Sequence, residues 1–174
     1  MENKRITCIT MLSDKSIKRI EDKVSGVKFN LCKVPYKENN REEKDKLPFH
    51  ATICVWNNGN KEEIKEIIKN INITNIKLKI TGTKIKQSYG DSFNIYFEFE
   101  KNNEFRKIQE IVYKYSNIEK YNPNSFIPHI TIHIDKDYSK ILELQNYIMK
   151  NFEAFEVEFN RLGVYEVYPP TKIL

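Results

Sequence analysis

Two of the three histidines in this chain of 174 residues stand in the same four-residue frame. His50 begins the run His-Ala-Thr-Ile, His129 begins the run His-Ile-Thr-Ile, and a proline lies just upstream of each, at Pro48 and Pro128. With so few histidines, finding a threonine two places after two of them is a chance event on the order of one in a hundred. An unperturbed imidazole titrates near pH ~6.5, so each ring can give or take a proton at neutral pH. The pair predicts one general base and one general acid facing a shared substrate.

The threonine in each frame adds what phosphoryl transfer needs. On a β-strand a His and the Thr two residues later project from the same face. Thr52 and Thr131 would then donate hydrogen bonds to non-bridging phosphate oxygens beside His50 and His129. Opening a 2′,3′-cyclic phosphate needs a base for the attacking water and an acid for the departing ribose oxygen, and two imidazoles supply both. The frames therefore predict phosphoester chemistry with no metal and no cofactor.

The segments before and after the first frame have the periodicities of strands and helices. Ser13 and Asn60 are caps for two segments with apolar residues at helical spacing, and β-branched runs predict the strands. A polar, charged loop from Pro35 to Pro48 leads into the frame, and we expect it either to close over substrate or to be a solvated connection. The expected order is a strand over 5–12, a helix to about 24, a strand over 27–34, the loop, a strand over 49–56 and a helix over 60–71.

The second half repeats this pattern. Strands over 76–88 and 92–100 turn at 89–91, a helix runs through Phe105 to Tyr115, and a turn over 122–124 precedes the second frame. The frame lies in a strand over 127–135, followed by a helix through Ile141 to Phe152 and a last strand or two over 155–168. The order strand, helix, strands, helix occurs in both halves, and this repetition predicts an α+β fold with two related lobes. We expect one domain over 1–174, with lobe one about 1–75 and lobe two about 76–174.

Composition sets the class of protein. The chain is 40% hydrophobic and 30% charged, as in a globular domain, and no apolar run approaches the ~18 residues that cross a bilayer. No signal peptide precedes the first strand, so we expect a cytoplasmic protein that does not bind membranes. The net charge of +5 suits an anionic partner such as RNA. Three separated cysteines, Cys8, Cys32 and Cys54, predict buried free thiols.

The two frames resemble the motifs of the two-histidine phosphoesterase superfamily, which includes bacterial 2′-5′ RNA ligases and cyclic nucleotide phosphodiesterases. The resemblance implies two pseudo-symmetric lobes, each a mainly antiparallel sheet with helices packed outside, and a central cleft that carries the two His-x-Thr strands. It implies that His50 and His129 are catalytic and that Thr52 and Thr131 bind the substrate phosphate. Implied substrates are 2′,3′-cyclic phosphates and 2′-5′ phosphodiesters of an RNA end, an oligonucleotide or a cyclic nucleotide. Run backwards, the same reaction would be an RNA ligation that needs no ATP.

Four further residues are candidates for substrate contact. Strand alternation puts His133 on the face of His129 and Thr131, where it would reach the cleft rim unless it is a solvated strand-end residue. Trp56 falls on the face of His50 and would either stack a base or pack in the core. Tyr36 and Tyr168, like Tyr165, are aromatic platforms for a base. A zinc site at His129 and His133 is not expected, because Cα atoms four residues apart on a strand are ~13 Å apart.

Two other functions remain open at this stage. In the first, the chain is a non-catalytic RNA- or nucleotide-binding module, whose binding weakens with salt and shows no bell-shaped pH dependence. In the second, both histidines are packed in a purely structural domain. In every case a monomer is favoured.

Overall fold

The computed structural model describes residues 5–25, 49–57, 60–73, 75–88, 90–115, 127–167 and 171–172. Several of the predictions lie outside these residues: the strand over 27–34, the loop over 35–48, the turn over 122–124, and the positions of Cys32, Tyr36, Pro48 and Tyr168. The remaining predicted strands and helices all fall on described residues.

The chain folds as an α+β protein, as the sequence predicts. The elements run in the order β1 (Arg5–Leu12), α1 (Asp14–Val24), β2 (His50–Asn57), α2 (Lys61–Lys69), β3 (Ile76–Gln87), β4 (Phe93–Phe99), α3 (Asn103–Tyr115), β5 (His129–Asp135), α4 (Tyr138–Met149), β6 (Phe155–Val167) and β7 (Thr171–Lys172). The first frame begins β2 and the second begins β5. Each frame therefore lies on a rigid strand.

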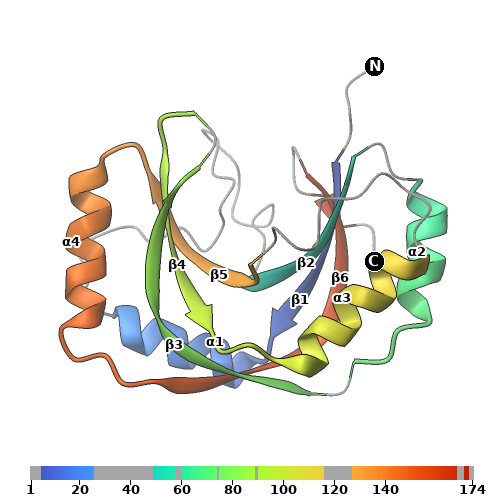
Figure 1. Ribbon diagram of the computed structural model, residues 1–174, viewed down its shortest axis with the longest axis horizontal. Coiled ribbons are helices and arrows are strands. Elements are labelled where there is room, and N and C mark those ends of the chain that lie inside the picture. The colour runs from blue at the N-terminus through green and yellow to red at the C-terminus, as the bar shows by residue number, and fades with distance from the viewer. Residues whose placement is uncertain are drawn as a thin grey trace.

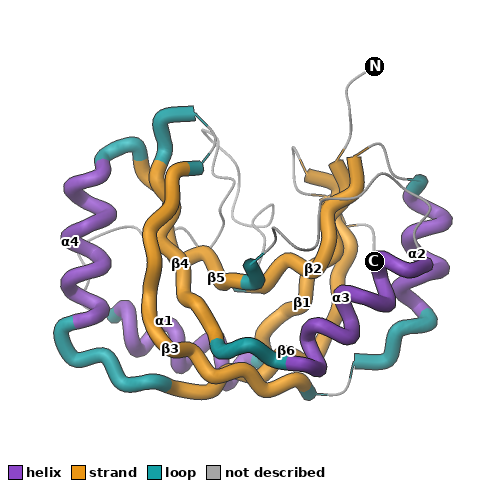
Figure 2. The backbone as a smooth tube through the Cα atoms, viewed as in Figure 1, coloured by secondary structure: helices purple, strands orange, loops and turns teal. Residues whose placement is uncertain are grey.

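All strands of the described residues belong to one antiparallel sheet in the order β1-β2-β5-β4-β3-β6-β7, and β1 also pairs with β6. This corrects the expectation of one sheet per lobe. The physical reason is the length of β6, which has 13 residues and pairs first with β3 and then with β1. Figures 1 and 2 show the sheet bent into a U, with β3 and β4 in one arm and β1 and β6 in the other.

The helices cover the convex side of this sheet. Helix α4 lies outside the arm of β3 and β4, and α2 and α3 lie outside the other arm (Figure 1). We call the helix-covered side the outer face and the opposite side the inner face. One apolar core fills the outer face and draws on both halves of the chain, including Ile53, Trp56, Phe97 and Ile130, each fully buried. A second, small cluster of Ile9, Met11 and Tyr165 is separate from it.

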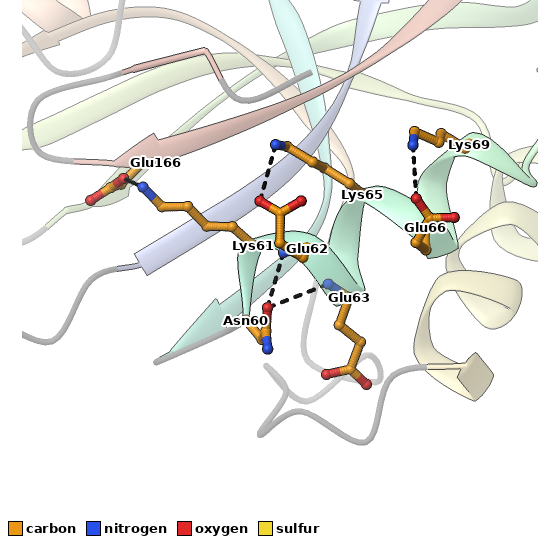
Figure 3. Close-up of polar contacts among 8 residues, drawn as sticks. All are labelled: Asn60, Lys61, Glu62, Glu63, Lys65, Glu66, Lys69 and Glu166. Atoms are coloured by element: carbon orange, nitrogen blue, oxygen red, sulfur yellow. Dashed lines mark hydrogen bonds and ion pairs between the residues drawn. The ribbon is translucent and has the colours of Figure 1, made fainter.

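Helix α2 shows how local sequence fixes an element to the sheet. The side chain of Asn60 accepts hydrogen bonds from the backbone N–H groups of Glu62 and Glu63, at 3.0 and 3.4 Å, as the predicted cap requires (Figure 3). Lys61 forms an ion pair with Glu166 on β6 (Figure 3). The cap starts the helix, and the ion pair holds its first turn against the end of β6.

Two other predictions concern the whole chain. Cys8 and Cys54 are buried free thiols, as expected, and burial raises the pKa of the Cys8 thiol. Among the described residues, none of the helices has the length and apolar character needed to cross a bilayer.

Candidate functional site

The two frames meet at the centre of the sheet. Strands β2 and β5 are antiparallel neighbours, and Ala51 is the register partner of Ile130. Both residues are fully buried in the core of the outer face. Strand alternation therefore turns the residues before and after them, which are the histidines and threonines of both frames, to the inner face.

Because the two strands are antiparallel, the frames run in opposite directions and each histidine faces the other frame's threonine. Continuing the antiparallel pairing by one residue sets His50 opposite Thr131 and Thr52 opposite His129. Directly opposite residues lie about 4.5–5.5 Å apart and diagonal ones about 7–8 Å apart, so the two histidines are diagonal neighbours. Their electrostatic coupling agrees with this, because a charge on His50 lowers the pKa of His129. The fold thus brings together all four residues that the sequence singled out.

Each frame ends in a β-bulge at its isoleucine. On β2, Thr52 pairs with Ile9 and Cys54 pairs with Cys8, so that Ile53 has no partner on β1. On β5 the register partners are Tyr96 for Thr131 and Ile95 for His133, which leaves out Ile132 in the same way. The extra residue reverses the alternation beyond each frame.

The amide of Gln109 on α3 supports the first bulge. Its Nε2 donates a hydrogen bond of 3.3 Å to the carbonyl of Ile53, the residue that the register shift takes out of pairing with β1. Gln109 is buried, and so is Ile53. A buried carbonyl at a bulge needs such a donor, so α3 stabilises the backbone conformation that follows His50 and Thr52.

The bulges overturn two predictions made by simple alternation. Trp56 is 0% exposed and belongs to the core of the outer face, so the prediction that it stacks a substrate base is wrong. His133 is paired with Ile95, a core residue, and so it does not share the face of Thr131 as predicted. It is buried, with its Nε2 3.7 Å from a carboxylate oxygen of Asp135. Among the aromatic candidates, Tyr165 does lie on the inner face, beside Ile9 and Met11.

His129 is held as a neutral ring with a defined tautomer. Its Nδ1 lies 2.7 Å from the carbonyl oxygen of Ile127, and since a carbonyl can only accept, Nδ1 carries the proton and Nε2 carries the lone pair. The Tyr96 ring packs against it, with ring centres 4.7 Å apart. Burial, the Lys86 ammonium and the charge of His50 lower the pKa of His129 to about 4, against a smaller rise from the Ile127 hydrogen bond.

His50 has a less polar environment. It is 9% exposed, and its register partner on β1 is Met11, part of the small apolar cluster. The hydroxyl of Tyr165 donates to the sulfur of Met11 at 3.8 Å. The threonine of this frame, Thr52, has Ile9 as its partner. The two residues of β1 that pair with His50 and Thr52 are thus both apolar.

The inner face beside β5 carries polar residues that sequence reasoning missed. Asn94 is buried, and its Nδ2 donates to the hydroxyl oxygen of Thr131 at 3.3 Å. That bond leaves the Thr131 proton free to point at a ligand. Glu98 is the register partner of His129 and pairs with Lys84 on β3, with an N–O distance of 2.6 Å.

These residues give the inner face two unlike walls. The apolar wall consists of Ile9, Met11, Gly163 and Tyr165, with Thr7 and Arg161 at its two ends as the register partners of Tyr165 and Met11. The polar wall consists of Lys84, Lys86, Asn94, Tyr96 and Glu98. The alternation of charge and polarity along β3 and β4 was visible in the sequence as a strand pattern. Its place beside His129 depends on the register between strands, which the sequence does not state.

No protein-family model matches the chain, and no curated protein sequence matches it. Two solved structures resemble it over nearly its whole length. One is of Usb1 from Kluyveromyces marxianus, with a TM-score of 0.56 and 13% identity over 99% of this chain and 98% of that one. The other is of the same protein with uridine monophosphate, with a TM-score of 0.53 and 13% identity over 98% of both chains. At this identity the likeness shows the fold.

Proposed function

We propose that the chain is a metal-independent phosphoesterase that acts on 2′,3′-cyclic phosphate or 2′-5′ phosphodiester groups of RNA ends or nucleotides. The observation that carries the proposal is the pairing of Ala51 with Ile130, because continuing that register by one residue gives each histidine the other frame's threonine as its neighbour. A phosphate on the inner face between the two frames would then meet an imidazole and a hydroxyl from each side. The structure of Usb1 with uridine monophosphate supports a nucleotide ligand for this fold.

His129 is the better candidate for the general base when water opens a cyclic phosphate. Its Nε2 is the nitrogen that carries the lone pair, because Nδ1 holds the proton that is donated to the carbonyl of Ile127. In the reaction, Nε2 takes a proton from the attacking water as the new P–O bond forms. The bond from phosphorus to one ribose oxygen breaks, and His50 gives that oxygen a proton. Thr52 and Thr131 donate to the non-bridging oxygens, on which charge develops.

Ring opening by a 5′-hydroxyl, which is the reverse of 2′-5′ phosphodiester cleavage to a cyclic phosphate, would be a ligation. A 5′-hydroxyl would attack the cyclic phosphate in place of water, with the same proton transfers, and the energy of the strained ring would replace ATP. Hydrolysis and ligation therefore need the same four residues. They differ only in the nucleophile that reaches the phosphorus.

Purified protein, assayed in EDTA against a panel of 2′,3′-cyclic nucleotides and 2′-5′ dinucleotides, tests the proposal. We expect turnover that is lost in His50→Ala and His129→Ala, while both variants keep the wild-type circular dichroism spectrum. The alternative, a binding module for RNA or nucleotides, predicts salt-sensitive binding with no turnover on any member of the panel. Wild-type rates in both alanine variants would contradict a catalytic role for these residues.

A further inference from the structure

Two lysines of β3 project from the inner face, and only one of them has a carboxylate partner among the described residues. Lys84 is the register partner of Tyr96 and Lys86 is the partner of Asn94. The ammonium of Lys84 is paired with Glu98 at 2.6 Å. In the described part of the chain, no carboxylate lies within ion-pairing distance of Lys86.

The Lys86 ammonium is nevertheless partly removed from water. Although the residue as a whole is exposed, partial burial of the ammonium lowers its pKa. Its Nζ lies 5.5 Å from the centre of the Tyr96 ring, a distance at which the ring face attracts a cation. An ammonium that is partly desolvated, with an aromatic ring but no anion beside it, is a favourable place for an anionic ligand group.

The Tyr96 ring connects this ammonium to the catalytic pair. With Lys86 Nζ 5.5 Å from the Tyr96 ring centre and that centre 4.7 Å from the His129 ring, Nζ lies within about 10 Å of His129. The two groups also interact electrostatically, since Lys86 is the second cause of the lowered His129 pKa. Lys86 is therefore close to the reacting group without being next to it.

We infer that Lys86 binds a second phosphate of the substrate, the one on the 5′ side of the sugar whose 2′,3′-cyclic phosphate reacts. The inference rests on the proposed function, because that function places the reacting phosphate at the two frames. The oxygens of that phosphate are bound by Thr52 and Thr131, whereas Tyr96 separates Lys86 from His129. On the apolar wall the cation is Arg161 of β6, the register partner of Met11, and a carboxylate oxygen of Asp14 lies 3.9 Å from it, whereas Lys86 has no carboxylate that close in the described part of the chain. A substrate with two phosphates thus has only one favourable direction of binding, and the ligand class is an oligonucleotide end.

The test compares two substrates that differ by one phosphate: uridine 2′,3′-cyclic phosphate and its 5′-phosphorylated form. We expect Lys86→Met to raise KM for the 5′-phosphorylated substrate about tenfold and to leave KM for the other within about twofold. The double variant Lys84→Met with Glu98→Gln is the matched control, since it removes a lysine two residues away together with the carboxylate that neutralises it. It should leave the ratio of the two KM values unchanged.

Equilibrium binding separates this inference from the proposed function. Uridine 3′-monophosphate and uridine 3′,5′-bisphosphate are the probes, because neither needs to be turned over. A wild-type preference for the bisphosphate that is lost in Lys86→Met supports the second-phosphate site even if no substrate is hydrolysed. Equal losses on both probes, or no loss on either, would overturn it.

Discussion

Strands β2 and β5 share a frame and a bulge but differ in the residues beside them. On β1, next to the first frame, the register partners are Ile9 and Met11; on β4, next to the second frame, they are Tyr96 and Glu98. The same backbone thus presents a histidine and a threonine twice, once beside an apolar wall and once beside a polar one.

The difference explains how two identical frames can take different roles. A proton acceptor must be neutral before the reaction, and the polar wall keeps His129 neutral through burial and the nearby Lys86 ammonium. The hydrogen bond to Ile127 then decides which nitrogen accepts. In the proposed reaction, the duplicated backbone would set the distance between the two groups and the unlike walls would set the direction of proton transfer.

The largest expected effect comes from removing each imidazole. We expect His50→Asn and His129→Asn each to lower kcat about 10³-fold on a 2′,3′-cyclic nucleotide, since each proton transfer contributes 10²–10⁴-fold. A leaving group that needs no proton separates the two. On a nucleoside 5′-(4-nitrophenyl) phosphate, which water attacks directly, His50→Asn should retain more of the wild-type rate than His129→Asn.

The proposed division of roles is contradicted if changing the leaving group does not change the relative activities of the two variants. Equal loss on both substrates in steady-state assays would mean that the walls do not divide the roles. A larger loss for His50→Asn on the nitrophenyl ester would mean that the roles are reversed. Thermal unfolding of both variants, expected to match wild type, excludes a common loss of structure.

The next effect concerns Asn94, which orients Thr131. Replacing Asn94 with leucine removes the donor to the Thr131 oxygen, and we expect kcat to fall about five- to tenfold, as for a hydrogen bond worth about 1 kcal/mol. Stability should change little. The other amide atom, Oδ1, is buried without a hydrogen-bond partner among the described residues, and leucine removes that unpaired acceptor as well. Steady-state kinetics and urea unfolding measure both.

Thr7 offers a control from the apolar wall. Thr7 precedes Ile9 by two residues, just as Asn94 precedes Tyr96 by two. Its hydroxyl donates to the carbonyl of Cys54 and not to a threonine of either frame. Thr7→Val should leave kcat within about twofold. In a Thr131→Val background, Asn94→Leu should have almost no further effect, and fully additive losses would contradict a role through Thr131.

Periodicity and capping sufficed to predict most of the fold. The strand over 5–12 and the caps at Ser13 and Asn60 were confirmed, because alternation and capping are local properties. Alternation also correctly placed the four frame residues on one face, because each bulge lies after the histidine and threonine of its frame. The fold class could be predicted for the same reason.

What the sequence did not show depends on contacts between strands. The bulges at Ile53 and Ile132 reverse the alternation, so Trp56 and His133 were placed on the wrong face. Nothing local marks these isoleucines as extra residues, because an isoleucine fits either position. The polar wall was missed because Asn94 reaches Thr131 only through the pairing of β4 with β5, and that register is set by the whole sheet.

The pH dependence of activity tests how the polar wall tunes His129. With the pKa of His129 lowered to about 4, the ring stays neutral and able to accept a proton down to about that pH. The acidic limb of kcat/KM should therefore fall near pH 4, well below the ordinary histidine value of ~6.5. Lys86→Met removes one of the causes that lower this pKa, so the limb should move to higher pH while burial keeps it below ~6.5.

The double variant Lys84→Met with Glu98→Gln again provides the control, because it removes both members of an ion pair and leaves the net charge of the wall unchanged. Its acidic limb should coincide with that of the wild type in a pH profile measured at constant ionic strength. A wild-type limb near pH ~6.5 would show that the polar wall does not lower the pKa of the base. The two walls would then differ in ligand binding but not in proton transfer.

The smallest expected effect comes from two glycines, one on each arm of the sheet. A Cβ on Gly163 would lie 2.8 Å from Cε2 of Tyr165 and 3.2 Å from Cε of Met11, so Gly163→Ala must displace the tyrosine ring. A Cβ on Gly82 would have as its nearest neighbour Oε1 of Glu98, at 3.5 Å, an ordinary contact. We expect Gly163→Ala to lower the free energy of unfolding by about 1 kcal/mol, and Gly82→Ala to leave it unchanged or raise it by a few tenths.

Urea unfolding of the two alanine variants measures this difference, and kinetics show whether it matters for function. Because Tyr165 packs on Met11, the register partner of His50, movement of the ring should change KM by about two- to threefold in Gly163→Ala and not in Gly82→Ala. Equal stability in the two variants would mean that Tyr165 moves freely and that the apolar wall does not hold His50 in place. If only Gly163→Ala loses stability and changes KM, close packing of the apolar wall positions His50, just as charge on the polar wall acts on His129.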